Sequence, residues 1–268
     1  MGKRTEKPQA CPYNSRLQKG GALLEDMRVL VCHWQDNDVA GQVNSGVFEN
    51  LLGKRTRSRT MDIFKILFVP RFVKGSPPNA WKIVRPLEEH SVSLEILRPI
   101  YYWITARNER LLYDFVCNEL MNRNQGQKQI INKKSVVRWL NTVLASCGKR
   151  WSKSVTDRVA SGILAALRDF GILNGAYHKK VAPIYLPVES FAYIAYAMYH
   201  EEGVSGSALV SHPDWSLFLI DKPIVERMFL EADRYGLLQY NAAGKIVRID
   251  FPARNFEEMA NVVATRAY

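Results

Sequence analysis

The stretch between Trp151 and Pro187 has the clearest pattern of hydrophobic and polar positions in the chain. In its first half, apolar residues recur at spacings of three and four, which places them on one face of a helix. That face consists of Val155, Val159, Ile163, Ala166, Leu167 and Phe170. The opposite face is polar and basic, with small residues at its centre, and consists of Ser154, Asp157, Arg158, Ser161, Ala165 and Arg168. The pattern predicts an amphipathic helix that begins at a Ser152 or Ser154 cap and ends at Gly171.

A β-hairpin is predicted directly after this helix. Asn174-Gly175 favours a tight turn because both residue types tolerate positive φ, and a β-rich segment follows from Val181 to Leu186. A helix followed at once by a basic hairpin is typical of a winged helix-turn-helix. In that motif the helix enters a DNA major groove and the wing contacts the flanking backbone. The alternative is a core helix packed on a small hairpin, with its charges only solvated.

Other stretches of the first half also carry helical patterns. Residues 17–34 hold an apolar stripe, residues 36–46 are turn-rich, and residues 47–72 hold two helical pieces separated by Gly53. We expect Ser58 to cap the second piece. Its predicted buried residues are Ile63, Phe64, Leu67 and Phe68. Further helices are predicted over residues 87–98, 111–121 and 134–147. The last of these, the basic turn at 148–150 and the Trp151 stretch follow the order of a winged-helix domain.

The C-terminal third repeats part of this plan. The phrase RDFGILNG at 168–175 is echoed by DRYGLLQYNAAG at 233–244. Both predict a helix end, a glycine stop, two apolar residues and a hairpin turn. Helices are predicted over 190–200 and 223–235, and strands over 237–240 and 245–251. We therefore expect a second winged-helix-like unit.

Together these elements predict a mainly α fold with small β-hairpins, containing winged helix-turn-helix-like units. The 268 residues suffice for two domains or one large one, and 47% of them are apolar. The predicted division is a flexible arm (1–15), an N-terminal basic helical region (16–80), a central winged helix-turn-helix domain (81–188) and a C-terminal helical, winged-helix-like domain (189–268).

The net charge of +11 is distributed unevenly. Residues 123–180 carry +10 and residues 1–75 carry +6, whereas residues 76–122 carry −1 and residues 181–268 carry −4. This asymmetry favours a polyanionic partner for the basic part. The acidic C-terminal unit is expected to hold partners or to pack internally rather than to bind DNA.

The sequence shows no signature of an enzyme, a metal site or a membrane span. P-loop, Gly-x-Ser-x-Gly and HExxH motifs are absent. His212 and Asp214 could form an acid–base pair, but a His-Pro turn anchored by Trp215 is favoured. The four cysteines, Cys11, Cys32, Cys117 and Cys147, form no Cys-x-x-Cys pair, and no signal peptide opens the chain, so reduced thiols in a cytoplasmic protein are predicted. We expect no cofactor and no metal.

Several sequence blocks resemble a known family. They are GGALLEDMRVL (20–30), ENLLGKRTRSRT (49–60), RVASGILAALRDFGIL (158–173), LVSHPDWSLFLID (209–221) and GKIVRIDFP (244–252). They are similar to the BrxA family, the small accessory protein of bacterial BREX (bacteriophage exclusion) defence systems. The resemblance spans nearly the whole chain. It implies a cytoplasmic, mostly helical protein without known catalysis, acting in phage resistance beside a methyltransferase, an ATPase and a phosphatase-like protein.

From the residues themselves we predict a non-enzymatic protein that binds double-stranded DNA. The groove-facing residues would be Lys153, Ser154, Asp157, Arg158 and Ser161, with Arg158 the candidate for a bidentate guanine contact. Phosphate contacts would come from Lys133, Lys134, Lys149, Arg150, Lys179 and Lys180. A second phosphate patch would consist of Lys54, Arg55, Arg57 and Arg59, clustered where a helix N-terminus favours anions; a solvated basic turn is the alternative there.

Two other functions remain open from the sequence. The BrxA family has been likened to the NusB-type RNA-binding antitermination factors, and an all-helical RNA-binding protein needs no aromatic ribonucleoprotein motif. A scaffold whose basic faces dock acidic defence proteins is the second alternative. Competition between DNA and RNA, and co-purification after nuclease treatment, would separate these three functions.

Overall fold

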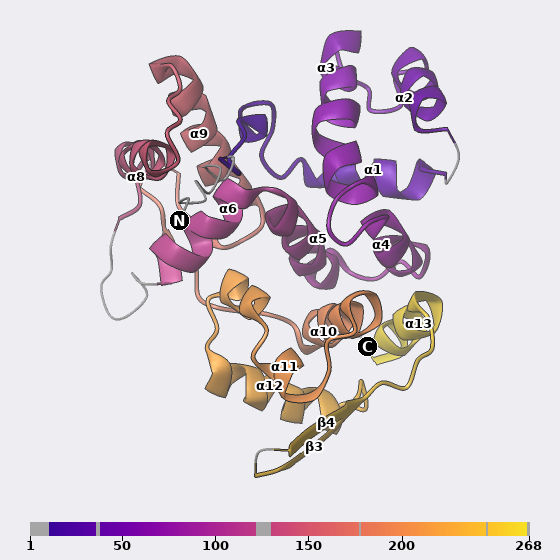
Figure 1. The fold of residues 1–268 in the computed structure, drawn as a ribbon. Coiled ribbons are helices and arrows are strands. Elements are labelled where there is room, and N and C mark those ends of the chain that lie inside the picture. The colour runs from indigo at the N-terminus through magenta and orange to yellow at the C-terminus, as the bar shows by residue number, and fades with distance from the viewer. Residues whose placement is uncertain (1–10, 36–37, 122–129, 177, 245, 267–268) are drawn as a thin grey trace, which may run out of the picture.

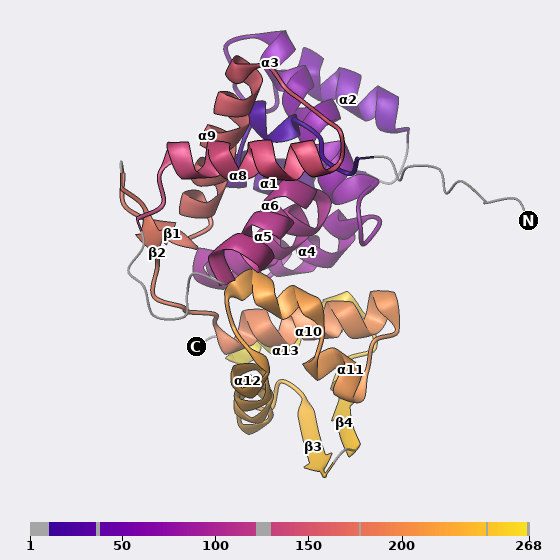
Figure 2. The same cartoon turned by 60° about the vertical axis from the view of Figure 1, so that its left-hand side comes forward.

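The computed structural model describes residues 11–35, 38–121, 130–176, 178–244 and 246–266. Helices dominate these residues, and each of the two sheets has two strands. The mainly α fold with small hairpins is therefore confirmed. Figures 1 and 2 show two layers, with α1 to α9 in the upper one and α10 to α13 with the β3–β4 hairpin in the lower one. No described helix is long and apolar enough to cross a membrane.

The N-terminal region contains more helix than its sequence pattern predicted. Its elements are η1 (Arg16–Gln18), α1 (Leu24–His33), α2 (Val39–Phe48), α3 (Arg57–Asp62) and η2 (Ile63–Val73). Helix α2 lies in the stretch expected to be turn-rich, and Asp38 caps it by accepting from the Ala40 N–H. The cap of α3 is Thr56, whose hydroxyl accepts from the Arg59 N–H at 3.2 Å, and not Ser58 as predicted.

Helix α3 continues directly into η2, an eleven-residue π-helix. It buries Ile63, Phe64, Leu67 and Phe68, as predicted. Arg71 of η2 is fully buried, and its guanidinium donates to Glu109 and to the carbonyl oxygens of Gly20 and Gly21. A buried charge is stable only when it is paired and hydrogen-bonded, so this arginine ties the segment after η1 to the core.

Helix α5 (Leu94–Asn108) joins the two layers. It follows α4 (Ala80–Glu89) and precedes α6 (Arg110–Asp114) and η3 (Phe115–Leu120). Trp103 of α5 is fully buried and donates to Asp214 at 2.7 Å, and Tyr102 donates to the Leu217 carbonyl at 3.0 Å. Both partners belong to the lower layer, so these bonds hold the two layers in register.

The central unit consists of α8 (Lys133–Ser146), α9 (Lys153–Asp169) and the β1–β2 hairpin (Leu173–Asn174 and Lys180–Val181). Asn132 and Ser135 form a capping box at the start of α8, and Ser152 caps α9, one of the two serines predicted. Ile131, just before α8, bridges Lys179 through two backbone hydrogen bonds. The chain at Ile131 therefore runs antiparallel beside Lys179, and the bridge connects the start of α8 to the hairpin.

The hairpin itself differs from its prediction. Leu173 pairs with Val181 and Asn174 with Lys180, so the connection spans residues 175–179 and is not a two-residue Asn-Gly turn. Strand structure ends at Val181, and residues 182–187 have no regular structure, although they were expected to be β-rich. Two prolines, Pro183 and Pro187, lie in this segment, and proline cannot donate to a strand ladder.

The C-terminal unit contains α10 (Val188–Glu202), α11 (Gly206–Val210), η4 (Pro213–Phe218), α12 (Lys222–Arg234), β3 (Gln239–Ala243), β4 (Ile246–Asp250) and α13 (Phe256–Arg266). Strands β3 and β4 pair antiparallel from Gln239↔Asp250 to Ala243↔Ile246. The predicted helix–hairpin order of α12, β3 and β4 is confirmed. Helix α13 packs against α4 and α10, and Tyr193 of α10 donates to the Ile83 carbonyl at 2.6 Å.

A disulfide joins Cys11 to Cys147, whose Cα atoms are 5.2 Å apart. The prediction of four reduced thiols is therefore wrong for this pair, while Cys32 and Cys117 are free. The sequence could not indicate the pairing, because 136 positions separate the two residues. Of the expected flexible arm, residues 1–10 lie outside the described residues, and the segment from Cys11 to Ser15 is held by this bond.

Candidate nucleic-acid interface

Helix α9 presents the polar face that its sequence predicted. Ser154, Arg158, Ser161 and Arg168 are exposed, and Asp157 and Ala165 are partly exposed. The predicted inward face is confirmed, since Val159, Ile163, Ala166 and Leu167 are fully buried, Phe170 is 5% exposed and Val155 is partly buried. Helix α9 is therefore oriented with its basic, small-residue face towards solvent.

The buried side of α9 is wider than its apolar stripe. Helix α8 covers one flank, while η1 and the segment after it cover the other. A Cβ atom at Gly162 would overlap the carbonyl group of Leu17, and one at Gly21 would lie 2.9 Å from the backbone nitrogen of Ala166. Two glycines thus permit close backbone contact, and they confine the solvent-facing part of α9 to the polar strip.

Arg158 is the strongest candidate on that strip. Its guanidinium donates to the Ser154 carbonyl at 3.2 Å and makes no ion pair with a carboxylate of any described residue. Arg168, nearly three turns further along, is paired with Asp169 at 2.7 Å. Lys153 is exposed at the first turn. The N-terminal half of α9 therefore carries uncompensated positive charge, and its C-terminal end does not.

The other predicted phosphate contacts of the central unit fall into two groups. Lys133, Lys134, Arg150 and Lys180 are exposed. Lys149 is partly buried, and its ammonium donates to the Tyr13 carbonyl at 2.7 Å. Lys179 is 7% exposed, and its ammonium donates to the carbonyls of Gly175 and Ala176, so it supports the hairpin loop. Burial and the charge of Arg168 lower the pKa of Lys179.

The second basic patch also contains both residues that are bonded within the fold and residues that are exposed. Lys54 pairs with Asp26 at 2.7 Å, and Arg59 donates to the Lys19 carbonyl, so both are engaged within the fold. Arg55 is exposed. Arg57 is exposed and lies 5.5 Å from the ring centre of Phe48, which is itself 72% exposed. Arg55 and Arg57 are the members of this patch that remain available for an anion.

The N-terminal ends of α3 and α9 lie at the same end of the molecule, although Figure 1 shows them on opposite sides of it. Both are at the upper end of the molecule in Figures 1 and 2, although α3 and α9 are far apart in the sequence. The two basic patches predicted separately therefore share one end of the fold. The sequence contained the charges but no signal that the two patches share one end of the fold, because tertiary packing establishes where the two helices lie.

The outer face of α12 has a different character. Its exposed positions include Lys222, Arg227, Leu230, Glu231 and Arg234, so charges of both signs surround an apolar residue. Leu230 is 47% exposed and Tyr235, at the end of the helix, is 51% exposed. Lys222 also pairs with Glu226, at 3.9 Å. A mixed surface of this kind attracts a polyanion less than the strip on α9 does.

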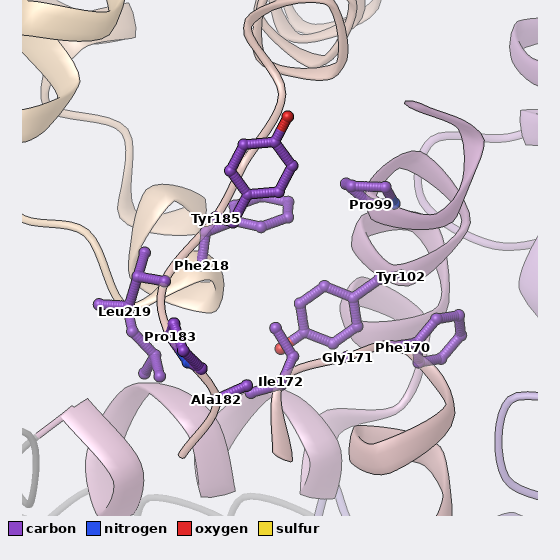
Figure 3. Close-up of a pocket in the computed structure, with 11 residues that line it drawn as sticks. Pro99, Tyr102, Phe170, Gly171, Ile172, Ala182, Pro183, Tyr185, Phe218 and Leu219 are labelled. Atoms are coloured by element: carbon purple, nitrogen blue, oxygen red, sulfur yellow. The ribbon is translucent and has the colours of Figure 1, made fainter. Parts of the chain in front are cut away.

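An apolar pocket lies between α5, the end of α9, the segment 182–185 and η4 (Figure 3). Its cavity volume is about 50 Å³, and it is lined by Pro99, Tyr102, Phe170, Gly171, Ile172, Ala182, Pro183, Ile184, Tyr185, Phe218 and Leu219. No charged side chain lines it, and the Tyr102 hydroxyl is already bonded to Leu217. The titratable groups in the lining are the two tyrosines, Tyr102 and Tyr185, and burial raises the pKa of both.

His212 and Asp214 also have structural partners. The His212 Nδ1 atom accepts from the Asp214 N–H at 3.2 Å and caps η4. The Asp214 carboxylate accepts from Trp103 and, at 3.0 Å, from Tyr113. These bonds favour the turn interpretation over an acid–base pair. Among the described residues, no group of three or more His, Cys, Asp or Glu side chains could hold a metal ion.

The fold and this surface define a helical protein with a basic face formed by helix N-termini. The family model of BrxA matches residues 11–197, so the chain belongs to the BrxA family and is a BREX-associated protein. A crystal structure of an uncharacterized protein from Magnetospirillum magneticum has a similar fold. Its TM-score is 0.59 at 14% sequence identity, over 77% of this chain and 97% of the other. No curated protein sequence matches the chain.

Proposed function

We propose that this BrxA-family protein is a non-catalytic, double-stranded-DNA-binding component of a cytoplasmic BREX phage-defence system. The observation that carries the proposal is the solvent-facing strip at the start of α9, where Lys153 and Arg158 have no carboxylate partner among the described residues. Positive charge left unpaired on an exposed helix suits a polyanion, and small neighbours such as Ser154 and Ser161 allow close approach to a groove.

The order of elements around α9 supports a winged helix-turn-helix. A bridge at Ile131, helix α8, helix α9 and the β1–β2 hairpin follow each other, and the bridge pairs with the hairpin. In this arrangement the start of α9 would enter the major groove, with Lys180 of the hairpin on the flanking phosphates. Lys133 and Lys134 at the start of α8, together with Arg150, would supply further phosphate contacts.

Arg55 and Arg57 would extend the surface. Because the N-terminal ends of α3 and α9 lie at the same end of the molecule, one duplex could contact both patches (Figure 1). Lys54, Arg59, Lys149 and Lys179 are bonded within the fold and would contribute mainly through their long-range charge. Asp157, near the middle of the strip, would accept from a cytosine amino group if it contacts a base.

Binding of a random-sequence DNA duplex at several salt concentrations tests this function. With five to eight phosphate contacts, the logarithm of the association constant should fall against the logarithm of salt concentration with a slope of about −4.5 to −7. A variant with Arg227→Ala and Arg234→Ala on α12 is the matched control and should bind like the parent. A slope near zero would refute electrostatic DNA binding.

Competition identifies which nucleic acid is bound. A structured RNA of equal length should displace the DNA duplex only weakly if DNA is the ligand. Stronger binding of the RNA would support the NusB-like alternative, since proteins recognise folded RNA mainly by shape and by its single-stranded loops. If neither nucleic acid binds, but other BREX proteins co-purify after nuclease treatment, the scaffold function would replace the proposal.

A further inference from the structure

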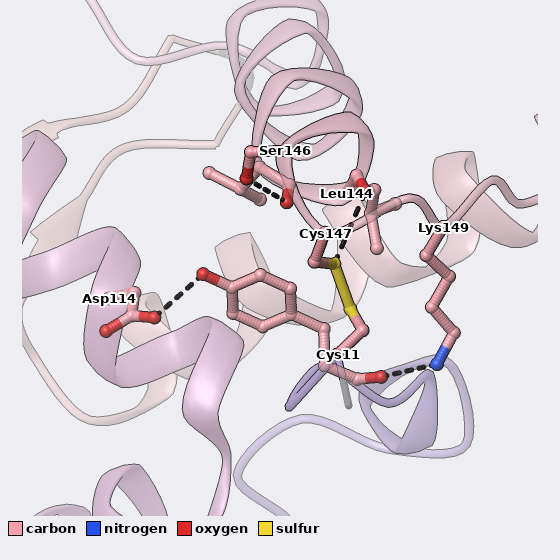
Figure 4. The surroundings of a disulfide bond; sticks show 8 residues. Cys11, Asp114, Leu144, Ser146, Cys147 and Lys149 are labelled. Carbon is pink, nitrogen blue, oxygen red and sulfur yellow. Dashed lines mark hydrogen bonds between the residues drawn. A yellow bond between two sulfur atoms is a disulfide. The ribbon is translucent and has the colours of Figure 1, made fainter. Parts of the chain in front are cut away.

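The Cys11–Cys147 disulfide connects the start of the described chain to the segment that leads into α9. Figure 4 shows the bond between the N-terminal strap, which we define as residues 11–15, and the C-terminal end of α8. Both cysteine residues are partly exposed, so the bond lies near the surface of the protein. It is also only a few residues from the candidate DNA surface.

The strap holds a lysine of that surface. The Tyr13 carbonyl accepts from the Lys149 ammonium at 2.7 Å, and the Tyr13 hydroxyl donates to Asp114 at 3.0 Å. Lys149 also lies 5.9 Å from the ring centre of Trp151, just before α9. While the strap is in place, one N–H of the Lys149 ammonium donates to this carbonyl, and the bond restricts where the ammonium can move to reach a phosphate.

The loop that carries Lys149 does not depend on the disulfide. The backbone N–H of Lys149 donates to the Leu144 carbonyl at 2.9 Å, and the Gly148 N–H donates to the Ala145 carbonyl at 3.0 Å. Gly148 has φ of +70°, a left-handed conformation that glycine adopts readily at a helix end. These bonds would keep the loop and the start of α9 in place if the disulfide opened.

The segment that follows the strap in the sequence is also anchored independently of the disulfide. Leu17 of η1 is 1% exposed and lies against α9 at Gly162, and Arg16 makes an ion pair with Glu109 at 3.5 Å. Once the disulfide opens, the strap loses its covalent bond to Cys147 and keeps the weaker hydrogen bonds of Tyr13 to Asp114 and Lys149. The elements η1, α8 and α9 keep their own anchors.

We infer that Cys11 and Cys147 form a reversible thiol–disulfide site whose reduction releases the strap and frees Lys149 to contact a phosphate of bound DNA. The inference rests on the proposed DNA-binding function. The oxidised protein should bind DNA more weakly than the reduced protein, because Lys149 donates to the Tyr13 carbonyl in the oxidised form.

The chemistry requires a thiol reductant. A thiolate of a dithiol attacks one sulfur of the pair, which breaks the S–S bond and forms a mixed disulfide with that cysteine. The second thiol of the reductant then displaces the cysteine. Two electrons and two protons pass to the protein, which leaves two cysteine thiols and an oxidised dithiol. An oxidising disulfide reverses the sequence.

The first experiment measures release of the strap without DNA. Chymotrypsin should cleave after Tyr13 at least several-fold faster in protein reduced with dithiothreitol and desalted than in oxidised protein. The protein should carry Cys32→Ser, which removes the exposed free thiol. Cys117 can stay, because burial and the nearby Asp214 raise its pKa to about 12, and a thiol in that state reacts slowly. Equal cleavage rates in the two forms would overturn the inference.

The second experiment measures DNA binding in both redox forms. One additional phosphate contact should make the salt slope steeper by about 0.9 in the reduced form, which corresponds to roughly fivefold to tenfold tighter binding near 0.1 M salt. Cys11→Ser should bind like the reduced parent under both conditions. Lys149→Ala should lose the redox difference, whereas Lys153→Ala should bind more weakly and keep it.

The outcomes distinguish the inference from the function on which it rests. Faster cleavage after reduction with no DNA binding in either form would refute the proposed function and, with it, the role of Lys149. DNA binding that is equal in the two forms would refute the inference and leave the function intact. A redox difference that persists in Lys149→Ala would also overturn the inference, because it would require another group to respond.

Discussion

Gly162 of α9 lies directly against the backbone of Leu17 in η1. A Cβ atom at residue 162 would be 2.8 Å from the Leu17 carbonyl carbon and nearer still to its oxygen. Contact at this distance is possible only without a side chain. It places the N-terminal segment along one flank of the helix that carries the candidate DNA-binding strip.

Gly162→Ala should therefore destabilise the protein even though alanine is the better helix former. We expect a loss of about 1–3 kcal/mol in the free energy of unfolding, because the added methyl group meets backbone rather than a movable side chain. Urea denaturation measures this loss. Ser161→Ala, at the adjacent exposed position, is the control and should stay within about 0.5 kcal/mol of the parent. A stabilised Gly162→Ala would show that η1 does not lie on α9.

Phe170 closes the inward face of α9. Its side chain is 5% exposed, and its ring centre lies 5.3 Å from that of Tyr102. Phe170→Ala should cost about 3–5 kcal/mol, since it removes a buried ring and leaves a cavity. Ile246→Ala, at a residue 75% exposed on the second hairpin, should change stability by less than about 0.5 kcal/mol. Equal urea midpoints for the two variants would mean that α9 is turned the other way.

Arg158 and the α3 patch should affect DNA binding differently. Arg158→Ala should cost roughly 1–3 kcal/mol and reduce any preference between duplex sequences, because a bidentate guanidinium discriminates bases. The double variant Arg55→Ala, Arg57→Ala should weaken binding to all sequences alike and make the salt slope shallower by about 1.8, or 0.9 for each lost phosphate contact.

Two unrelated duplexes, each titrated at several salt concentrations, are enough to separate these effects. Arg59 is left unchanged because it donates to the Lys19 carbonyl. Arg248→Ala, on an exposed strand of the second hairpin, serves as the control for loss of one positive charge away from the strip. If Arg158→Ala binds like the parent while the double variant loses all binding, the N-terminal region is the DNA-binding surface and α9 is only structural.

Glu202 gives the protein a predictable response to acid. Burial acts to raise its pKa, but hydrogen bonds from His212 and Arg107 outweigh burial and lower the pKa from 4.5 to about 2. A carboxyl group whose pKa is lowered by folding stabilises the folded state above its unfolded pKa, and this contribution disappears as the pH falls towards 2. In Glu202→Gln the decline in stability between about pH 5 and pH 2 should therefore be smaller than in the parent.

Urea midpoints measured across this pH range test the effect. Glu201→Gln is a suitable control, because Glu201 pairs with His200, at 3.0 Å, rather than with Arg107. That variant should follow the curve of the parent. A Glu202→Gln curve parallel to that of the parent would show that the pairing of α5 with α10 through Arg107 does not form.

Local features of the chain were predictable from the sequence. The inward face and the Ser152 cap of α9, the burial of Phe64 and Phe68, and the helix–hairpin order at the C-terminus all depend on side-chain periodicity or turn chemistry within a few residues. Helix α2 was missed because its sequence, VAGQVNSGVF, is rich in turn-forming residues. Tertiary packing and the Asp38 cap outweigh the weak helix propensity there.

Only the tertiary structure decided which basic side chains are bonded within the fold and which stay exposed to bind an anion. The sequence by itself determined that Lys149, Lys179 and Arg158 lie in a strongly basic stretch, and it predicted a DNA contact for each of them. Folding brings Tyr13 to Lys149 across 136 positions and closes the hairpin loop over Lys179, while Arg158 stays exposed. The physical reason is that periodicity specifies which face of a helix is polar, whereas the atoms that meet that face come from distant segments whose positions are established by burial of the shared core.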